Sequence, residues 1–284
     1  MLIDTRVRPR DLPMRASRPS GMTLIELTVV IAILAILAGL LLPRLAFMRT
    51  LSLHAGAATS IQEVSQNLLS FHTTQAKWPH RFDSLLTSAS AGGTPSGFYG
   101  SGGGAYGLTT DLTGGLLQVT TLTTGERNSL RGLLGNPSGN TTLLQVMDHD
   151  ETNTKPGSSG VFMRDLNNGG DLTVCTINPT HNVNPSDPNS ASGSVIFNSI
   201  FTDGLNPNNE KLVALGVGPM CTAVNKTIVT PPQIYQRDAT RYNRVIIIIR
   251  VRPDGVQASL ASAISPDGRT LDQCLGNYRT TAER

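Results

Sequence analysis

The 284-residue sequence has few charged residues (15%), few aromatic residues (5%) and only three cysteines. Gly, Ser, Thr, Asn and Pro take their place, and these residues favour turns and exposed strands over long helices. The cysteines form no CxxC pair and have no histidine at zinc-ligand spacing, which argues against a structural metal site. The histidines form no HxxxH or HExxH pair, and no G-x-S-x-G elbow or Ser/His/Asp set is recognisable. The sequence therefore indicates neither an enzyme nor a bound cofactor.

Most of the chain also lacks an excess of either positive or negative charge. The net charge is +3, and residues 1–21 account for all of it with five arginines and two aspartates. The remaining residues hold 18 basic and 18 acidic side chains. Because a balanced body has no steering field for polyanions, no nucleic-acid partner is expected.

One long apolar run stands out against this background. Residues 22–42 read MTLIELTVVIAILAILAGLLL, with a single charge at Glu26. A helix of this length is roughly 31 Å long, close to the thickness of about 30 Å of a bilayer's hydrocarbon core. The arginines before the run predict, by the positive-inside rule, a cytoplasmic N-terminus and an exported body. The sequence thus predicts a single-pass inner-membrane segment at residues 22–43.

A buried core helix and a secretory signal peptide both fit the apolar run less well. A core helix rarely has an uninterrupted apolar stretch of this length. A signal peptide would be cut after the run, where residues 43–46 match poorly, whereas the best small-residue processing point precedes it at Ser20-Gly21. Neither accounts for Glu26, because a carboxylate within a membrane span costs free energy and is expected to have a function and a partner.

Residues 21–27, Gly-Met-Thr-Leu-Ile-Glu-Leu, closely resemble the prepilin peptidase recognition motif of type IV pilins and type II secretion pseudopilins. In that family Gly precedes the cut and Glu is the fifth mature residue; most members begin with Phe, and Met is an accepted variant. The resemblance implies that the peptidase removes leader residues 1–21 and N-methylates Met22. It also implies that Glu26 pairs with the Met22 amine of a neighbouring subunit and so sets the register of a filament, since a misplaced subunit leaves both charges uncompensated.

Gly39 and Pro43 fall where the family often places helix-softening residues. Pro lacks an N–H and clashes with the preceding turn, so a kink at Pro43 is expected, with the end of the helix there as the alternative. The partners implied by the resemblance are prepilin peptidase, other pilin or pseudopilin subunits, an inner-membrane assembly platform and membrane lipid.

Beyond residue 44 the apolar residues follow one helix face at three- and four-residue steps up to Phe71. Residues 22–77 are thus predicted to form one helix: a membrane or filament-core half at 22–43, then an amphipathic continuation within 44–78. Residues 79–284 are predicted to form a β-rich body with long loops, exported to the periplasm or the cell exterior. Its strands are expected at Leu116–Thr123, Thr141–Met147, Leu172–Ile177, Ser194–Phe201, Lys211–Val217 and Arg244–Val251. The fold class is α+β, with the long helix packed on an antiparallel, pilin-like sheet.

The body contains two further candidate features. Because pilins often staple a terminal loop, the resemblance favours a disulfide between Cys221 and Cys274, although the sequence alone leaves all three pairings open. Asp165, Asn167 and Asp171 place oxygen ligands loosely as at the start of a calcium loop, but the late bidentate Glu is missing. An ordinary turn is favoured there, and no metal is expected.

These features predict a structural subunit of a type IV pilus or a type II secretion pseudopilus. The alternative is a membrane-anchored surface receptor or adhesin that uses the pilin export route. A filament subunit sediments with sheared fibres, whereas an anchored receptor stays with the membrane, so fractionation separates the two hypotheses.

Overall fold

The computed structural model describes residues 23–83, 85, 115–134, 142–145, 162–165, 172–182, 191–201, 206, 208–230, 234, 242–256 and 258–282. The chain divides into two compact units, Met1–Met48 and Arg49–Arg284. Helix α1, Leu24–Gln75, begins in the first unit and ends in the second. The helix predicted over residues 22–77 is confirmed within two residues at each end, and it continues through Pro43 without ending there.

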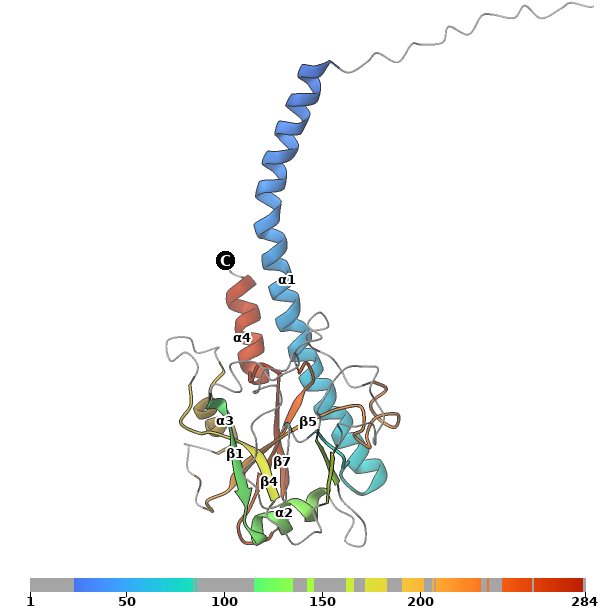
Figure 1. The fold of residues 1–284 in the computed structure, drawn as a ribbon, viewed down its shortest axis with the longest axis vertical. Helices are drawn as coiled ribbons and strands as arrows, with labels where there is room; N and C mark the ends of the chain where they lie inside the picture. Colours follow the sequence, from blue (N-terminus) through green and yellow to red (C-terminus); the bar gives the residue numbers. More distant parts are fainter. Residues whose placement is uncertain are drawn as a thin grey trace, which may run out of the picture. The chain divides into compact units, whose positions relative to one another are not determined.

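The second half of α1 runs beside the sheet of the body (Figure 1), and one of its faces is buried. From Ala58 on, its buried apolar residues recur at steps of three and four, as one side of a helix requires: Ala58, Ile61, Val64, Leu68 and Phe71. The helix stops where Ala76 adopts a left-handed conformation, with φ of 51°, which a following helical turn cannot accommodate. Pro79 follows and, lacking an N–H, cannot restart the helix.

The body is built on a five-stranded antiparallel sheet with strand order β1-β4-β5-β6-β7. These strands are β1 (Leu117–Leu122), β4 (Leu172–Ile177), β5 (Lys211–Gly216), β6 (Ile246–Val251) and β7 (Ser259–Ile264). Strands β2 (Thr142–Gln145) and β3 (Phe162–Asp165) form a separate antiparallel pair. The helix and the antiparallel sheet together confirm the α+β fold class.

Both faces of β5 and β6 are buried, which explains why these strands read as continuous apolar runs. Because side chains alternate along a strand, Ile247 and Ile249 join the core that contains the second half of α1. Ile246 and Ile248 join a second core on the opposite face. Helix α3 (Gly193–Ile200) contributes Ile196 to that second core. The sheet is therefore the middle layer, with α1 on one face and α3 on the other.

The structure corrects the sequence prediction at several elements. Ser194–Phe201, predicted as a strand, is helix α3, and Ser192 caps its first turn by accepting a hydrogen bond from the Val195 N–H. Strands β3 and β7 and helices α2 (Thr124–Leu134) and α4 (Leu271–Ala282) were not predicted. Strands β1, β2, β4, β5 and β6 are confirmed, with bounds that differ by at most two residues.

Two of these helices begin with the same reciprocal capping motif, in which side chains satisfy N–H groups that have no helical partner. At α2 the Thr123 N–H donates to Glu126 Oε2 at 2.8 Å, and the Glu126 N–H donates to Thr123 Oγ1 at 3.3 Å. At α4 the Thr270 N–H donates to Gln273 Oε1 at 3.0 Å, and the Gln273 N–H donates to Thr270 Oγ1 at 3.3 Å. The T-x-x-E/Q pattern thus marks both helix starts.

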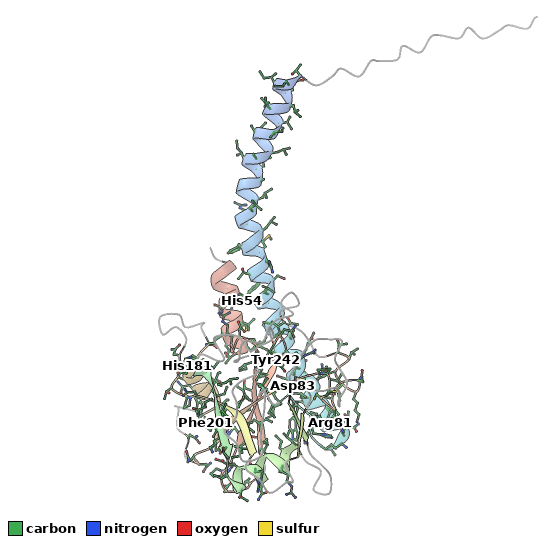
Figure 2. The ribbon with its side chains drawn as sticks, in the orientation of Figure 1. His54, Arg81, Asp83, His181, Phe201 and Tyr242 are labelled. Atoms are coloured by element: carbon green, nitrogen blue, oxygen red, sulfur yellow. The ribbon has the colours of Figure 1, made fainter. Side chains whose placement is uncertain are left out.

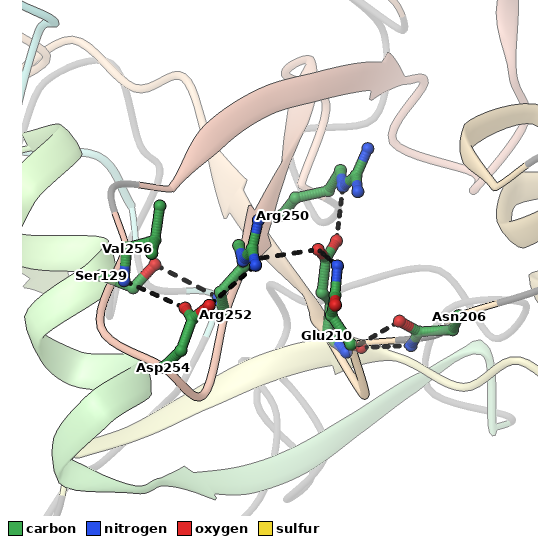
Figure 3. Close-up of polar contacts among 8 residues, drawn as sticks. Ser129, Asn206, Glu210, Arg250, Arg252, Asp254 and Val256 are labelled. Atoms are coloured by element: carbon green, nitrogen blue, oxygen red, sulfur yellow. Dashed lines mark hydrogen bonds and ion pairs between the residues drawn. The ribbon is translucent and has the colours of Figure 1, made fainter.

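A buried carboxylate ties the start of β5 to the end of β6 (Figure 3). Glu210 Oε2 accepts a hydrogen bond from Arg250 Nε at 2.6 Å, and Arg252 Nε lies 3.8 Å from Glu210 Oε1. Burial raises the pKa of Glu210, but hydrogen bonds from Arg250 and Asn208 and the nearby arginine charges outweigh it, so the net shift is downward. The ion pair therefore favours the charged carboxylate in the folded chain.

Glu210→Gln should lower the free energy of unfolding at pH 7 by about 1–3 kcal/mol, because it weakens a charge-assisted hydrogen bond in a buried site. The wild-type advantage should disappear as the pH falls through the lowered folded-state pKa of Glu210, since both states then bind the proton. Urea unfolding of the full chain in detergent at pH 7 and at acid pH measures both effects. Asp254→Asn is the control, because its pair with Arg252 is exposed and should change stability little. Equal losses in the two variants would contradict this account.

Candidate functional site

The N-terminal end of α1 carries Glu26, the residue that the sequence marks as functional. Glu26 lies in the first turn of the helix, where Thr23 precedes the first helical residue. Glu26 Oε2 accepts two hydrogen bonds, from the Thr23 N–H at 2.8 Å and from Thr23 Oγ1 at 3.0 Å. In return the Glu26 N–H donates to Thr23 Oγ1 at 3.3 Å. Thr23 and Glu26 thus form a capping box like those of α2 and α4.

The capping box fixes where the carboxylate points. The first N–H groups of a helix lack internal partners and give this end a partial positive charge, which favours an anion. Both residues are exposed, so the pair does not depend on burial. An ionised carboxylate has about four acceptor positions, so the two bonds from Thr23 leave capacity for another donor. The site can therefore hold a negative charge at the helix terminus and still accept a cation.

The surface that follows this site on α1 is apolar. Among the side chains that the structure describes between residues 24 and 48, fourteen large apolar ones are exposed, from Val30 at 41% to Leu24 at 80%. The Thr28 hydroxyl donates a hydrogen bond to the Ile25 carbonyl of the same helix at 2.9 Å. This half of α1 lacks the polar stripe of an ordinary surface helix, so it offers a contiguous apolar surface for another molecule to cover.

No helix in the described part of the chain is long and apolar enough to cross a membrane. The span predicted at residues 22–43 is therefore not confirmed and stays a prediction.

The structure places only some of the other predicted residues. Gly21 and Met22 lie outside the described residues. Gly39 and Pro43 lie within α1, several turns beyond Glu26, and are not brought to the capping box. A side chain at Gly39 would meet open space, so this glycine is not required by close packing within the chain. The kink expected at Gly39 and Pro43 stays a prediction.

The predicted Cys221–Cys274 disulfide is not formed: Cys175, Cys221 and Cys274 are all free and buried. Cys175 belongs to the core on the α3 side of the sheet, whereas Cys221 and Cys274 belong to the core on the α1 side. The sheet thus separates Cys175 from the other two. Burial raises the pKa of Cys221 to about 12 and that of Cys274 to about 11, so both are thiols at neutral pH.

The calcium candidate falls largely outside the described part of the chain. Asp165 ends β3, while Asn167 and Asp171 lie outside the described residues. Among the described residues, no group of three or more His, Cys, Asp or Glu side chains could hold a metal ion.

Thr23 is a site residue that the sequence prediction missed. Its signal is present, because Thr23-Leu-Ile-Glu26 has the T-x-x-E spacing of a capping box in front of an apolar run. The family resemblance predicts a role for Glu26 as a charge in the filament but says nothing of its local hydrogen bonds.

Comparison with known families agrees with this picture of the N-terminal region. Residues 17–42 match the prokaryotic N-terminal methylation motif. That motif is the hallmark of the prepilin-type signal, and it supports a type IV pilin-like or pseudopilin-like protein. The motif also implies processing by prepilin peptidase and assembly with other pilin subunits. No curated protein and no solved structure matches the chain.

Thr23→Val should loosen the first turn of α1, because it removes the hydroxyl that accepts from Glu26 and donates to it. Loss of an N-cap hydroxyl should increase amide exchange in residues 24–27 by about three- to tenfold. Hydrogen-exchange mass spectrometry of the full chain in detergent micelles measures it. Thr28→Val is the matched control, because its hydroxyl bonds a carbonyl inside the helix and caps nothing. If both variants exchange alike, the capping box does not stabilise the helix start.

Proposed function

We propose that this chain is a structural subunit of a type IV pilus or a type II secretion pseudopilus. The observation that carries the proposal is the exposed apolar surface of α1 between residues 24 and 48, most of which lies within the methylation motif at residues 17–42. Burying apolar surface contributes about 25 cal/mol per Å², so such a surface strongly favours packing against similar helices or lipid. A filament of parallel subunits offers that environment repeatedly.

The subunit is made as a precursor and cut between Gly21 and Met22 by prepilin peptidase, which methylates the new amine. Before assembly, lipid covers the apolar half of α1 in the inner membrane, with the arginine-rich leader in the cytoplasm and the body outside. An inner-membrane assembly platform passes the subunit to the filament. Support for this proposal comes from the motif at residues 17–42 and from the arginine excess before the apolar run.

In the filament, Glu26 accepts the Met22 amine of a neighbouring subunit. The capping box supports this role, because it holds the carboxylate at the helix terminus while leaving acceptor capacity. A charge left alone among apolar helices is costly, whereas a charge pair offsets part of the desolvation of both groups. Subunits in the wrong register would leave both charges unpaired.

Coexpression with a prepilin peptidase should remove residues 1–21 and leave an N-methylated Met22. Intact-mass measurement of the mature chain reads both changes at once. Gly21→Ala should block the cut, because the scissile bond is approached through this small residue. A mature N-terminus after Pro43, or a precursor whose cleavage is insensitive to Gly21→Ala, would contradict the assignment.

Variants of Glu26 separate its charge from its capping role. Glu26→Gln keeps a side-chain acceptor for the Thr23 N–H, as Gln273 does at α4, but has no charge. Glu26→Ala loses both. If charge pairing sets the register, both variants should be cleaved normally and both should fail to enter sheared filaments in the native background. Thr23→Val is the control, because it weakens the cap and keeps the charge.

The measurement is the amount of each variant in membrane and filament fractions. Assembly of Glu26→Gln at the wild-type level would show that the charge pair is dispensable. A wild-type chain that never sediments with sheared filaments and stays with the membrane would favour the anchored receptor or adhesin instead.

A further inference from the structure

A second carboxylate, far from Glu26 in the sequence, is buried where the chain leaves α1. Asp83 is 1% exposed and lies on the segment that follows the helix, opposite Tyr242, which is also 1% exposed (Figure 2). Tyr242 Oη donates to Asp83 Oδ2 at 2.8 Å. The other oxygen, Oδ1, is buried and accepts no hydrogen bond from the described part of the chain. Such a half-satisfied buried carboxyl is uncommon in a native core and calls for a physical cause.

The backbone of Asp83 is part of the sheet. Its N–H donates to the Gly216 carbonyl and its carbonyl accepts from the Gly216 N–H, both at 2.9 Å. Strand β4 pairs with β5 only at Val213 and Ala214, so Asp83 takes the place beside Gly216 where β4 is no longer paired. Three residues earlier, His80 N donates to Thr222 Oγ1 at 2.9 Å, and Thr222 N donates to the His80 carbonyl at 3.0 Å. The segment from His80 to Asp83 is thus fastened at both ends.

Two glycines make room for the side-chain pair. A Cβ at Gly216 would overlap Tyr242 Oη, and a Cβ at Gly218 would overlap both carboxyl oxygens of Asp83. The close approach of the chain at these two positions therefore requires glycine. The close packing at Gly216 and Gly218 keeps water from the Asp83 carboxyl, and the Tyr242 hydroxyl is its hydrogen-bond donor.

We propose that Asp83 and Tyr242 form a proton-dependent latch, which fastens the segment after α1 to β5 while the Asp83 carboxyl holds its proton and loosens when that proton is lost. The geometry supports it, because a neutral carboxyl tolerates one unsatisfied oxygen in a dry site far better than a carboxylate does. The latch concerns the body of the protein and does not depend on the proposed filament.

The charged and titratable groups around Asp83 agree with this direction. Burial raises the pKa of Asp83 to about 7, although the Tyr242 hydrogen bond and the Arg244 charge both lower it. Cys221, the third titratable neighbour, has its own pKa raised to about 12 and is uncharged near neutrality. Because the folded chain binds this proton more tightly than the unfolded chain, stability is greatest at acid pH. It should fall as the pH rises towards 7 and level off above it.

The test compares wild type with Asp83→Asn, full-length and in detergent micelles, from pH 5 to pH 8. Trp78, the only tryptophan of the chain, lies five residues before Asp83 and reports urea unfolding by its fluorescence. Its stacking partner His72, 4.5 Å away between ring centroids, is present in both proteins, so its effect on the fluorescence cancels in the comparison. Relative to the variant, the unfolding equilibrium constant of wild type should rise about tenfold per pH unit between pH 5 and 7.

Hydrogen exchange, corrected for intrinsic rates, locates the effect. Protection of residues 80–83 and 216–222 should fall with rising pH in wild type and not in Asp83→Asn. Tyr242→Phe removes a donor that favours the carboxylate, so the pH at which stability levels off should be higher in this variant than in wild type. If Asp83→Asn fails to fold, Tyr242→Phe takes its place in the comparison. Asp254→Asn, an exposed carboxylate, should keep the wild-type profile. Parallel profiles for wild type and Asp83→Asn, or an unmoved plateau in Tyr242→Phe, would overturn the latch.

Discussion

Helix α1 buries one face of its second half against the sheet, whereas the large apolar side chains of its first half are exposed on all sides. Most other features of the chain follow from this difference in burial between the two halves of α1. The second half needs a sheet whose surface is apolar, and β5 and β6 supply it with Val213, Leu215, Ile247 and Ile249. The first half leaves a large apolar surface exposed, and surfaces of this kind mark sites of contact with another protein or a membrane. The same helix thus contributes to the core of the body and exposes the surface that we propose for assembly.

The ends of the helices show a second common device. At α1, α2 and α4 a threonine and an acidic or amide side chain three residues later satisfy each other's backbone N–H groups. At α2 and α4 the partner side chain is buried, and at α2 the Glu126 carboxylate also accepts a hydrogen bond from Lys211 Nζ at 2.8 Å. At α1 the same arrangement is exposed and stands beside the predicted cleavage site. A widespread structural motif is therefore placed where its carboxylate has a second possible partner.

The sequence predicts those features that depend on neighbouring residues. The periodicity of α1 and the β-branched run of β6 are both confirmed, because each element's apolar pattern matches the surfaces it covers. The strand prediction for α3 is wrong. Val195, Ile196 and Phe197 favour strands by their intrinsic propensity, but the N-cap at Ser192 and the burial of one helix face stabilise a helix. The capping box at Thr23 is local and could have been predicted from its spacing. The Asp83–Tyr242 contact joins residues 159 positions apart, so no local pattern could indicate it.

Glu26 and Asp83 show how surroundings assign different tasks to the same functional group. Glu26 is exposed and accepts two hydrogen bonds from Thr23, so its negative charge is favoured and remains available to a cation. Asp83 is enclosed, accepts one hydrogen bond, and is therefore more stable with a proton. The donors around a carboxylate thus decide whether it acts as a charge or as a proton carrier. In this chain the first kind, Glu26, lies beside the surface that we propose for assembly. The second, Asp83, lies where the segment that leaves α1 joins the sheet through two backbone hydrogen bonds with Gly216. Loss of the Asp83 proton weakens the side-chain contact with Tyr242 beside those backbone bonds.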